Sequence, residues 1–245
     1  MTKLFDFQQV FTNIPELLNY LPITLELALL AMLIGLVLGL ILAIIKMKQI
    51  PVLKQIATLF VSIVRGTPVL VQLYIVYFGV PMFFKAMNQK YGTDFAVAEI
   101  PGFVYAVLAL GLNSSAFSAE MIRSALMSVG KGQLEAANAL GMTYWQALRR
   151  IIIPEALVVA LPTIGNSLIS AIKGTSLAFT CAVVEITAQG KIIGGRSYRY
   201  FEVYCSLAII YWLVTVVIEQ ILKFTENKLA IPEQVETYIE QKDEQ

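Results

Sequence analysis

Five polar residues that stand inside largely apolar segments are the candidates for binding a solute. They are Gln72, Asn113, Ser114, Ser115 and Glu185. Amide and hydroxyl groups can donate and accept hydrogen bonds, and a carboxylate can attract a cationic group. Along a passage through a membrane, such residues could orient a small polar solute. Helix-to-helix hydrogen bonding is the alternative role for the amides and hydroxyls, and contact with solvent is the alternative for Glu185.

A polar stretch between two apolar segments has the composition of a docking surface for a soluble partner. It begins with Glu135-Ala136-Ala137, and Gly141 follows four residues after Ala137. The residues from Leu134 to Leu140 favour a helix, and glycine can adopt the left-handed backbone conformation that ends one. The spacing therefore predicts a short helix that stops in a sharp turn at Gly141.

The next residues predict a second short helix. Thr143 and Gln146, three residues apart, match a capping box at its start, and Arg149 and Arg150 suit the negative end of its dipole. Pro154 discourages continuation, because proline has no amide N–H. We expect two short helices at an angle to each other. The alternative is an amphipathic connector that lies on a membrane.

Composition places these motifs in an integral membrane protein. Of the 245 residues, 58% are hydrophobic and 14% charged, and the mean hydropathy is +0.72, which is too apolar for a soluble domain of this size. A helix needs about 20 apolar residues to cross the hydrocarbon core of a bilayer. We therefore predict an all-α fold with about five membrane-spanning helices, in the segments Thr24–Ile45, Val52–Phe84, Pro101–Ala125, Ala156–Thr187 and Phe201–Phe224.

Two of these segments are long and contain residues that interrupt helices. Gly66-Thr67-Pro68 lies in the second segment and Lys173-Gly174 in the fourth. Each of these spans is therefore predicted to be tilted, broken or partly interfacial. Glu120 and Arg123 stand three residues apart in the third segment, and we expect them to form an ion pair on one helix face.

The distribution of basic residues predicts the orientation of the chain in the cell membrane. An odd number of spans places the termini on opposite sides. With the N-terminus outside, ten basic residues fall in inner segments and six in outer ones, so the positive-inside rule favours a cytoplasmic C-terminus. The predicted organisation is a transmembrane domain over residues 1–224, with a cytoplasmic coupling loop at about 126–155, and a polar cytoplasmic tail over residues 225–245.

Several classes of protein are disfavoured by what the sequence lacks. There is no basic cluster with interleaved aromatic residues, so nucleic acid is not an expected partner. The chain has no histidine, which weakens a zinc or proton-relay interpretation. It also has no phosphate-binding Gly-x-x-x-x-Gly-Lys-[Ser/Thr] motif. We predict a transporter subunit that is not an enzyme and holds no cofactor or metal of its own.

The motifs together resemble those of one transporter family. Glu135-Ala136-Ala137 with Gly141, followed after nine residues by Ile151-Ile152-Ile153-Pro154, resembles the EAA loop of ABC importer permeases, with Ile153 in place of the family's leucine. Further segments resemble the branch that imports polar amino acids, with Phe117 replacing a common tyrosine and Gly174 replacing an acid. They are Arg65-Gly66-Thr67-Pro68, Asn113 through Glu120, Lys173 through Leu177, and Arg199 through Tyr204.

The resemblance implies a type I ABC importer permease fold and a set of partners. In that family, residues matching Glu135, Ala136, Ala137 and Gly141 form the surface that couples to separate ATPase subunits, which bind ATP and Mg. A second permease subunit, identical or related, an extracytoplasmic substrate-binding protein and a polar amino acid complete the expected system in the lipid bilayer. An ion-coupled secondary amino-acid transporter is the alternative, although it would usually show an inverted repeat that is not evident here.

Overall fold

The computed structural model describes residues 5–96 and 99–229, and within them it forms helices joined by turns, without strands. Two short helices, α1 (Phe7–Thr12) and α2 (Ile14–Leu18), precede the first long helix, α3 (Leu21–Met47). The side chain of Asp6 accepts a hydrogen bond from the amide of Gln8 and so caps α1. Proline lies in the first turn of α2 and of α3, where its missing N–H costs no hydrogen bond.

The second predicted span is two helices. They are α4 (Leu53–Gly66) and α5 (Val69–Tyr91), and Thr67 and Pro68 between them have extended backbones. Pro68 cannot donate an amide hydrogen bond, and it restricts Thr67 to the extended region. The predicted interruption at Gly66-Thr67-Pro68 is confirmed. The third span follows as α6 (Gly102–Ser128), a single helix.

The remaining elements build the region between the third and last spans and the last span itself. They are α7 (Lys131–Ala139), α8 (Tyr144–Ala147), a π-helical turn η2 (Leu148–Ile152), α9 (Ile153–Gly174), a 3₁₀ segment η3 (Thr175–Cys181), α10 (Ile186–Ser197) and α11 (Tyr200–Leu229). The α-helical geometry of α9 ends at Gly174 and the chain continues as the 3₁₀ segment η3, so the predicted irregularity at Lys173-Gly174 is a change of helix type and not a break. The fourth span stops at Cys181, short of the predicted boundary at Thr187. Within the predicted tail, α11 continues to Leu229, and residues 230–245 lie outside the described residues.

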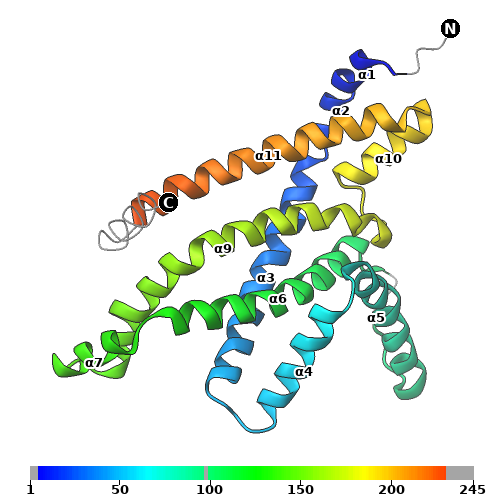
Figure 1. The fold of residues 1–245 in the computed structure, drawn as a ribbon. Helices are drawn as coiled ribbons and strands as arrows, with labels where there is room; N and C mark the ends of the chain where they lie inside the picture. The colour runs from blue at the N-terminus through cyan, green and yellow to red at the C-terminus, as the bar shows by residue number, and fades with distance from the viewer. Residues whose placement is uncertain (1–4, 97–98, 230–245) are drawn as a thin grey trace.

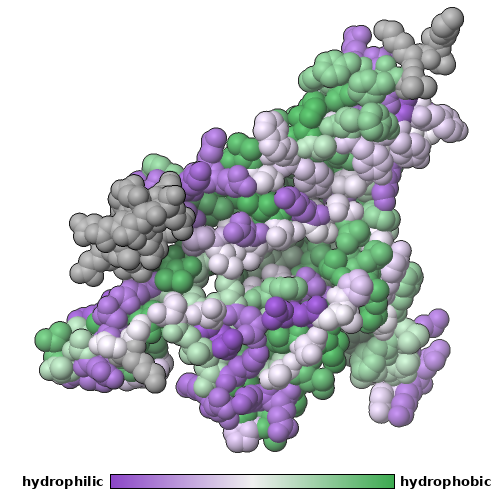
Figure 2. Space-filling view, in the orientation of Figure 1, coloured by the Kyte–Doolittle hydropathy of each residue, from purple (hydrophilic) through white to green (hydrophobic). Residues whose placement is uncertain are grey.

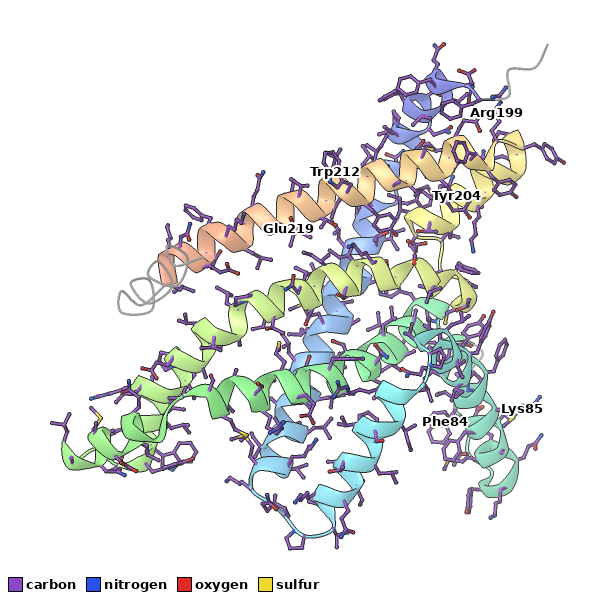
Figure 3. All side chains as sticks on the ribbon, in the orientation of Figure 1. Phe84, Lys85, Arg199, Tyr204, Trp212 and Glu219 are labelled. Atoms are coloured by element: carbon purple, nitrogen blue, oxygen red, sulfur yellow. The ribbon has the colours of Figure 1, made fainter. Side chains whose placement is uncertain are left out.

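Five helical segments are long and apolar enough to cross a membrane, which confirms the predicted count. They are Leu21–Met47, Val69–Tyr91, Gly102–Ser128, Tyr144–Cys181 and Tyr200–Leu229. Large apolar side chains are exposed along them, as expected for surfaces that face lipid. Trp212, for example, is 65% exposed and projects from α11 (Figure 3).

Close contacts between α3 and α6 show that these two helices run in the same direction. Gly35 lies against Ser114 and Gly39 against Ser118, so residue numbers rise together along both helices. Helix α9 runs the opposite way, because Ala156 packs with Ala125 near the end of α6. Figure 1 shows α6, α9 and α11 following one another across α3, with α5 to one side.

The start of the described chain and its end lie at opposite ends of this bundle. The hydroxyl of Ser206, near the start of α11, donates a hydrogen bond of 2.7 Å to the carbonyl of Val10 in α1. At the other end of α11, Leu222 lies against Gly165 of α9. The ends of α3, α6 and α11 therefore share one side of the bundle, and α7 and α8 belong to that side (Figure 1).

Gly39→Ala is expected to destabilise the bundle, because a Cβ at position 39 would lie 2.6 Å from the Cβ of Ser118 and 2.9 Å from the amide nitrogen of Ala119. Backbone must move to relieve such contacts, at a cost of about 1–3 kcal/mol. Thermal unfolding in detergent measures the effect as a lower midpoint. The matched control is Gly79→Ala in α5, where a Cβ meets nothing within 4 Å. Equal midpoints for the two variants would contradict this packing.

Candidate coupling surface and polar pathway

The predicted docking surface forms as a short exposed helix that ends at a glycine turn. Glu135 and Ala136 are exposed on α7, whereas Ala137 is buried. Gly141 has φ of +75°, the left-handed region that a side chain disfavours. The amide of Gly141 donates to the carbonyl of Asn138. Helix α7 packs against α8 and η2, so the surface is held on a folded platform.

The second short helix starts as predicted and ends differently. The Thr143 hydroxyl accepts from the amide of Gln146, and the Gln146 side chain accepts from the amide of Thr143 over 2.8 Å, which completes the predicted capping box. The predicted stop before Pro154 is wrong. The chain stays helical from Tyr144 through η2 into α9, because Pro154 lies in the first turn of α9 after a π-helical turn.

This continuity has a mechanical consequence. A single helical segment of 38 residues, Tyr144–Cys181, contains both α8 and a membrane span. A push on α8 therefore acts on α9 directly, and a push on α7 reaches α9 through the contacts of α7 with α8 and η2. Arg149 and Arg150 are exposed on the connecting turn.

Gln72 and Asn113, two candidate pathway residues, lie together at the break between α4 and α5. The amide nitrogen of Asn113 donates to the side-chain oxygen of Gln72 over 3.0 Å. The amide nitrogen of Gln72 donates to the carbonyl of Val64 over 2.8 Å and to the Thr67 hydroxyl over 2.8 Å. Gln72 thus donates a hydrogen bond to a backbone carbonyl near the end of α4, where the helix offers no further amide partner. Through Asn113 it also links the break to α6.

The two serines have different surroundings. Ser115 is fully buried and donates to the carbonyl of Leu112 in its own helix over 2.7 Å. Ser114 is partly buried and lies where α6 crosses Gly35 of α3. Small hydroxyl residues allow helices to approach closely. Ser114 therefore contributes to packing between α3 and α6, and Ser115 borders a groove between α3, α4 and α6.

Glu185 is fully buried in a separate polar cluster. It caps α10 by accepting from the amide of Ala188 over 2.8 Å, and it lies 3.4 Å from the hydroxyls of Thr24 and Tyr211. Thr187 in turn lies 2.8 Å from the Tyr211 hydroxyl. Burial raises the pKa of the Glu185 carboxyl, which stands outside the five candidate spans, and its hydrogen bonds oppose that rise. Sequence alone did not indicate Thr24 or Tyr211.

The structure does not bring Glu185 together with the Gln72–Asn113 pair. Glu185 bonds to Thr24, whereas Ser114, next to Asn113, lies against Gly35 of the same helix. Eleven residues of helix correspond to about 16 Å. A single small amino acid could not touch both places at once.

Charged groups on the spans are paired where they are enclosed. Glu120 bonds to Arg123 over 3.0 Å, which confirms the predicted ion pair, and it also bonds to Lys46 of α3. Glu202 is paired with Arg199 over 3.0 Å, at the corner labelled in Figure 3. Among the described residues, Glu185 and Glu202 are the buried acids. Glu202 pairs directly with Arg199, whereas Glu185 makes no direct ion pair and interacts with the more distant charge of Lys191.

Two exposed polar stripes on the helices add to these candidates. Both have the spacing i, i+3, i+7, i+10, which places four side chains on one helix face. Figure 2 shows hydrophilic side chains gathered on the face over α4, α6 and α9. The guanidinium of Arg65 lies 5.5 Å from the ring centre of Phe117, which joins the α4 stripe to α6. The stripes are Gln55, Thr58, Ser62 and Arg65 on α4, and Thr163, Asn166, Ser170 and Lys173 on α9.

The stripes could have been found in the sequence from their spacing. Most residues between the stripe positions are apolar, so the composition of each segment indicates only an apolar helix. A polar stripe on a helix at membrane depth is unfavourable against lipid, so it is expected to face water, another helix or a solute.

A bundle of five candidate spans that carries a polar face and an exposed short helix is the arrangement of a multi-pass membrane transport subunit. Residues 35–231 match the family described as "Binding-protein-dependent transport system inner membrane component". The chain belongs to this family, which confirms the resemblance found in the EAA motif, and it is a multi-pass protein of the cell membrane.

Named relatives come from several bacteria. The chain is 40% identical to the "Probable amino-acid permease protein YxeN" of Bacillus subtilis over 93% of this chain and 97% of that protein. It is 40% identical to the "L-cystine transport system permease protein TcyL" of the same organism, over 94% and 93% respectively. It is 34% identical to the "Glutamine transport system permease protein GlnP" of Escherichia coli, over 93% and 99%.

Solved structures agree with the fold. The structure described as an amino acid ABC transporter with histidines matches with a TM-score of 0.77 and 37% identity, over 93% of this chain and 100% of that chain. The MetNI methionine ABC transporter matches with a TM-score of 0.69 at 19% identity, over 88% and 96%. The all-helical importer-type architecture is therefore confirmed, and transport by a membrane subunit that is not itself an enzyme is the function of the family.

Proposed function

We propose that this chain is the permease subunit of an ATP-driven ABC importer for a polar amino acid. The observation that carries the proposal is the exposed α7 surface, which packs against α8 and η2 at the start of the helical segment that continues into α9. An ATPase that binds α7 and changes shape on binding ATP would tilt α9 and its polar stripe. This tilt would open the polar face to one side of the membrane in one state and to the other side in the other state.

The proposed assembly contains two copies of the permease or two related chains, with two ATPase subunits that bind ATP and Mg. Five spans cannot readily enclose a water-lined passage alone, whereas a symmetric pair can form one along its axis. We place the N-terminus outside and the coupling surface in the cytoplasm, where ATP is available. An extracytoplasmic binding protein would deliver the amino acid at the opposite end of the bundle.

The proposed pathway follows the polar face. Arg65 and the positive end of the α5 dipole suit a carboxylate, and the Gln72–Asn113 pair offers further donors and acceptors. The small side chains of Ser114 and Ser115 would let α6 pack closely against its neighbours, in the position that brings Asn113 to Gln72. Glu185 is buried without a direct ion pair, although the charge of Lys191 interacts with it. We propose Glu185 as a second, separate site that receives a cationic group when its cluster opens.

Asn113→Ala is expected to lower uptake of neutral and cationic amino acids alike. The substitution removes the bond to Gln72 and one polar contact of the pathway, and one neutral hydrogen bond corresponds to about a fivefold change in rate. Initial uptake rates into vesicles with saturating binding protein measure the loss. Asn19→Ala, the same change at an exposed position outside the spans, is the control. Unchanged uptake of every transported substrate would return Asn113 to a packing role.

Copurification tests the proposed partnership. The full chain, affinity-tagged and expressed in its own cells with its genomic neighbours, should retain an ATPase through a mild detergent. Glu135→Lys, a charge reversal on the exposed α7 surface, should release that ATPase while the chain stays in the membrane fraction. Retention of no ATPase by the unaltered chain, under conditions where it remains folded, would contradict the proposal.

A further inference from the structure

A groove on the surface of the bundle lies outside the polar face and the coupling surface. It has a volume of about 300 Å³ between α3, α4 and α6, which is at the lower end for sites that hold small molecules. Its walls are apolar almost throughout. The lining residues include Leu38, Ile41 and Ile45 of α3, Ile56 and Phe60 of α4, and Leu112 of α6.

The groove opens to the outside of the bundle. Ile41 is 50% exposed and Ile56 is 58% exposed, so the side chains on both walls face whatever surrounds the spans. For a chain embedded in a bilayer, that surrounding is the acyl chains of lipids. The walls run lengthwise along α3 and α4, which suits an extended hydrocarbon chain.

Basic residues cluster where the two walls meet. The connection between α3 and α4 joins the ends of the groove walls at Ile45 and Leu53, and it brings Lys48 and Lys54 beside them. The ammonium of Lys54 bonds to the side-chain oxygen of Gln49 over 2.6 Å, a neutral partner. Lys48 is exposed and has no acidic partner among the described residues. Both lysines therefore keep an unneutralised charge.

The place of these lysines in the chain suits contact with a lipid headgroup. They follow the end of a membrane span, on the side of the bundle to which α6 and α7 also lead (Figure 1). Basic residues just beyond a span attract anionic headgroups. Position and charge at the rim therefore complement the apolar walls below it.

We propose that this groove binds one anionic phospholipid of that leaflet, with an acyl chain between α3 and α4 and the phosphate at Lys48 and Lys54. The basic rim selects an anionic headgroup, so we commit to a lipid as the occupant, and cover by a second copy of the chain is an outcome of the test. The proposal requires only that the chain lies in a bilayer, and it does not depend on which substrate is transported.

Fluorescence quenching by brominated lipids tests the site. In the full chain carrying Trp145→Phe and Trp212→Phe, Phe60→Trp places a reporter in the groove, and Ile56→Trp is a second reporter should the first disturb folding. Leu40→Trp reports the opposite side of α3 at similar depth. The chain is reconstituted with brominated phosphatidylglycerol or brominated phosphatidylcholine at equal mole fraction.

We expect the groove reporter to prefer the anionic lipid by about fivefold or more, because each of the two lysines contributes about that factor near an anionic surface. Lys48→Gln with Lys54→Gln should remove that preference, and the Leu40→Trp reporter should show none. Equal quenching by the two lipids in the groove would overturn the proposal. So would an equal preference at position 40, which indicates general attraction, or weak groove quenching by both lipids, which indicates that protein covers it.

Discussion

Gly141→Val is expected to uncouple ATP hydrolysis from transport while leaving the chain inserted in the membrane. Position 141 has φ of +75°, where a side chain costs about 1–2 kcal/mol and a β-branched one more. Space is not the obstacle, because a Cβ there would meet nothing within 4 Å. The strain would instead reshape the turn that sets α7 against α8, and uptake should fall by about tenfold or more.

Reconstituted complexes provide the measurement, with substrate-stimulated ATP hydrolysis and uptake followed in the same vesicles. Gly132→Val is the matched control, since Gly132 is exposed on α7, has open space around it and has no positive φ. It should retain most of its coupled activity. If Gly141→Val transports at the control's rate, the turn at Gly141 does not serve coupling.

Glu185→Gln is expected to lower uptake of an arginine-like substrate roughly tenfold more than uptake of a neutral one. The amide keeps an oxygen that can accept from Ala188, so the cap of α10 can survive. The negative charge is lost, and a hydrogen bond to a charged group is worth about 1.5–3 kcal/mol. A cationic substrate therefore loses an attraction that a neutral one never had.

Competition between the two substrates at saturating binding protein makes the comparison within one preparation. Thr24→Val, which removes one hydroxyl from the same cluster without changing its charge, is the control for a general disturbance of the site. Equal losses for both substrates in Glu185→Gln would show that the residue positions α10 and does not select charge.

Span count, span interruptions and the capping box all follow from local rules. Thr67-Pro68 removes a donor and forces extended backbone, and Thr143 with Gln146 caps a helix through bonds within four residues. Such features depend on neighbours in sequence, so sequence predicts them. The continuation through Pro154 was not predictable in this way, because a π-helical turn before a proline depends on how α8 meets α9.

The candidate site likewise combines features that local sequence predicts with contacts that depend on the packing of distant helices. Residue types identified Gln72 and Asn113 as polar, but their mutual hydrogen bond depends on α5 and α6 crossing at that point. Glu185 was recognisable as an acid near a span, whereas its partners Thr24 and Tyr211 come from the first and last long helices. Contacts between segments this far apart arise from packing of the whole bundle, which no local pattern encodes.

ATP-dependent uptake by a purified complex tests the central claim most directly. The chain, its copurified ATPase and the binding protein are reconstituted in sealed vesicles, with ATP and Mg on the side of α7 and a labelled polar amino acid on the other. The proposal predicts accumulation that requires ATP hydrolysis and stops with Glu135→Lys. Accumulation driven by a proton or sodium gradient without ATP, and unaffected by Glu135→Lys, would contradict it.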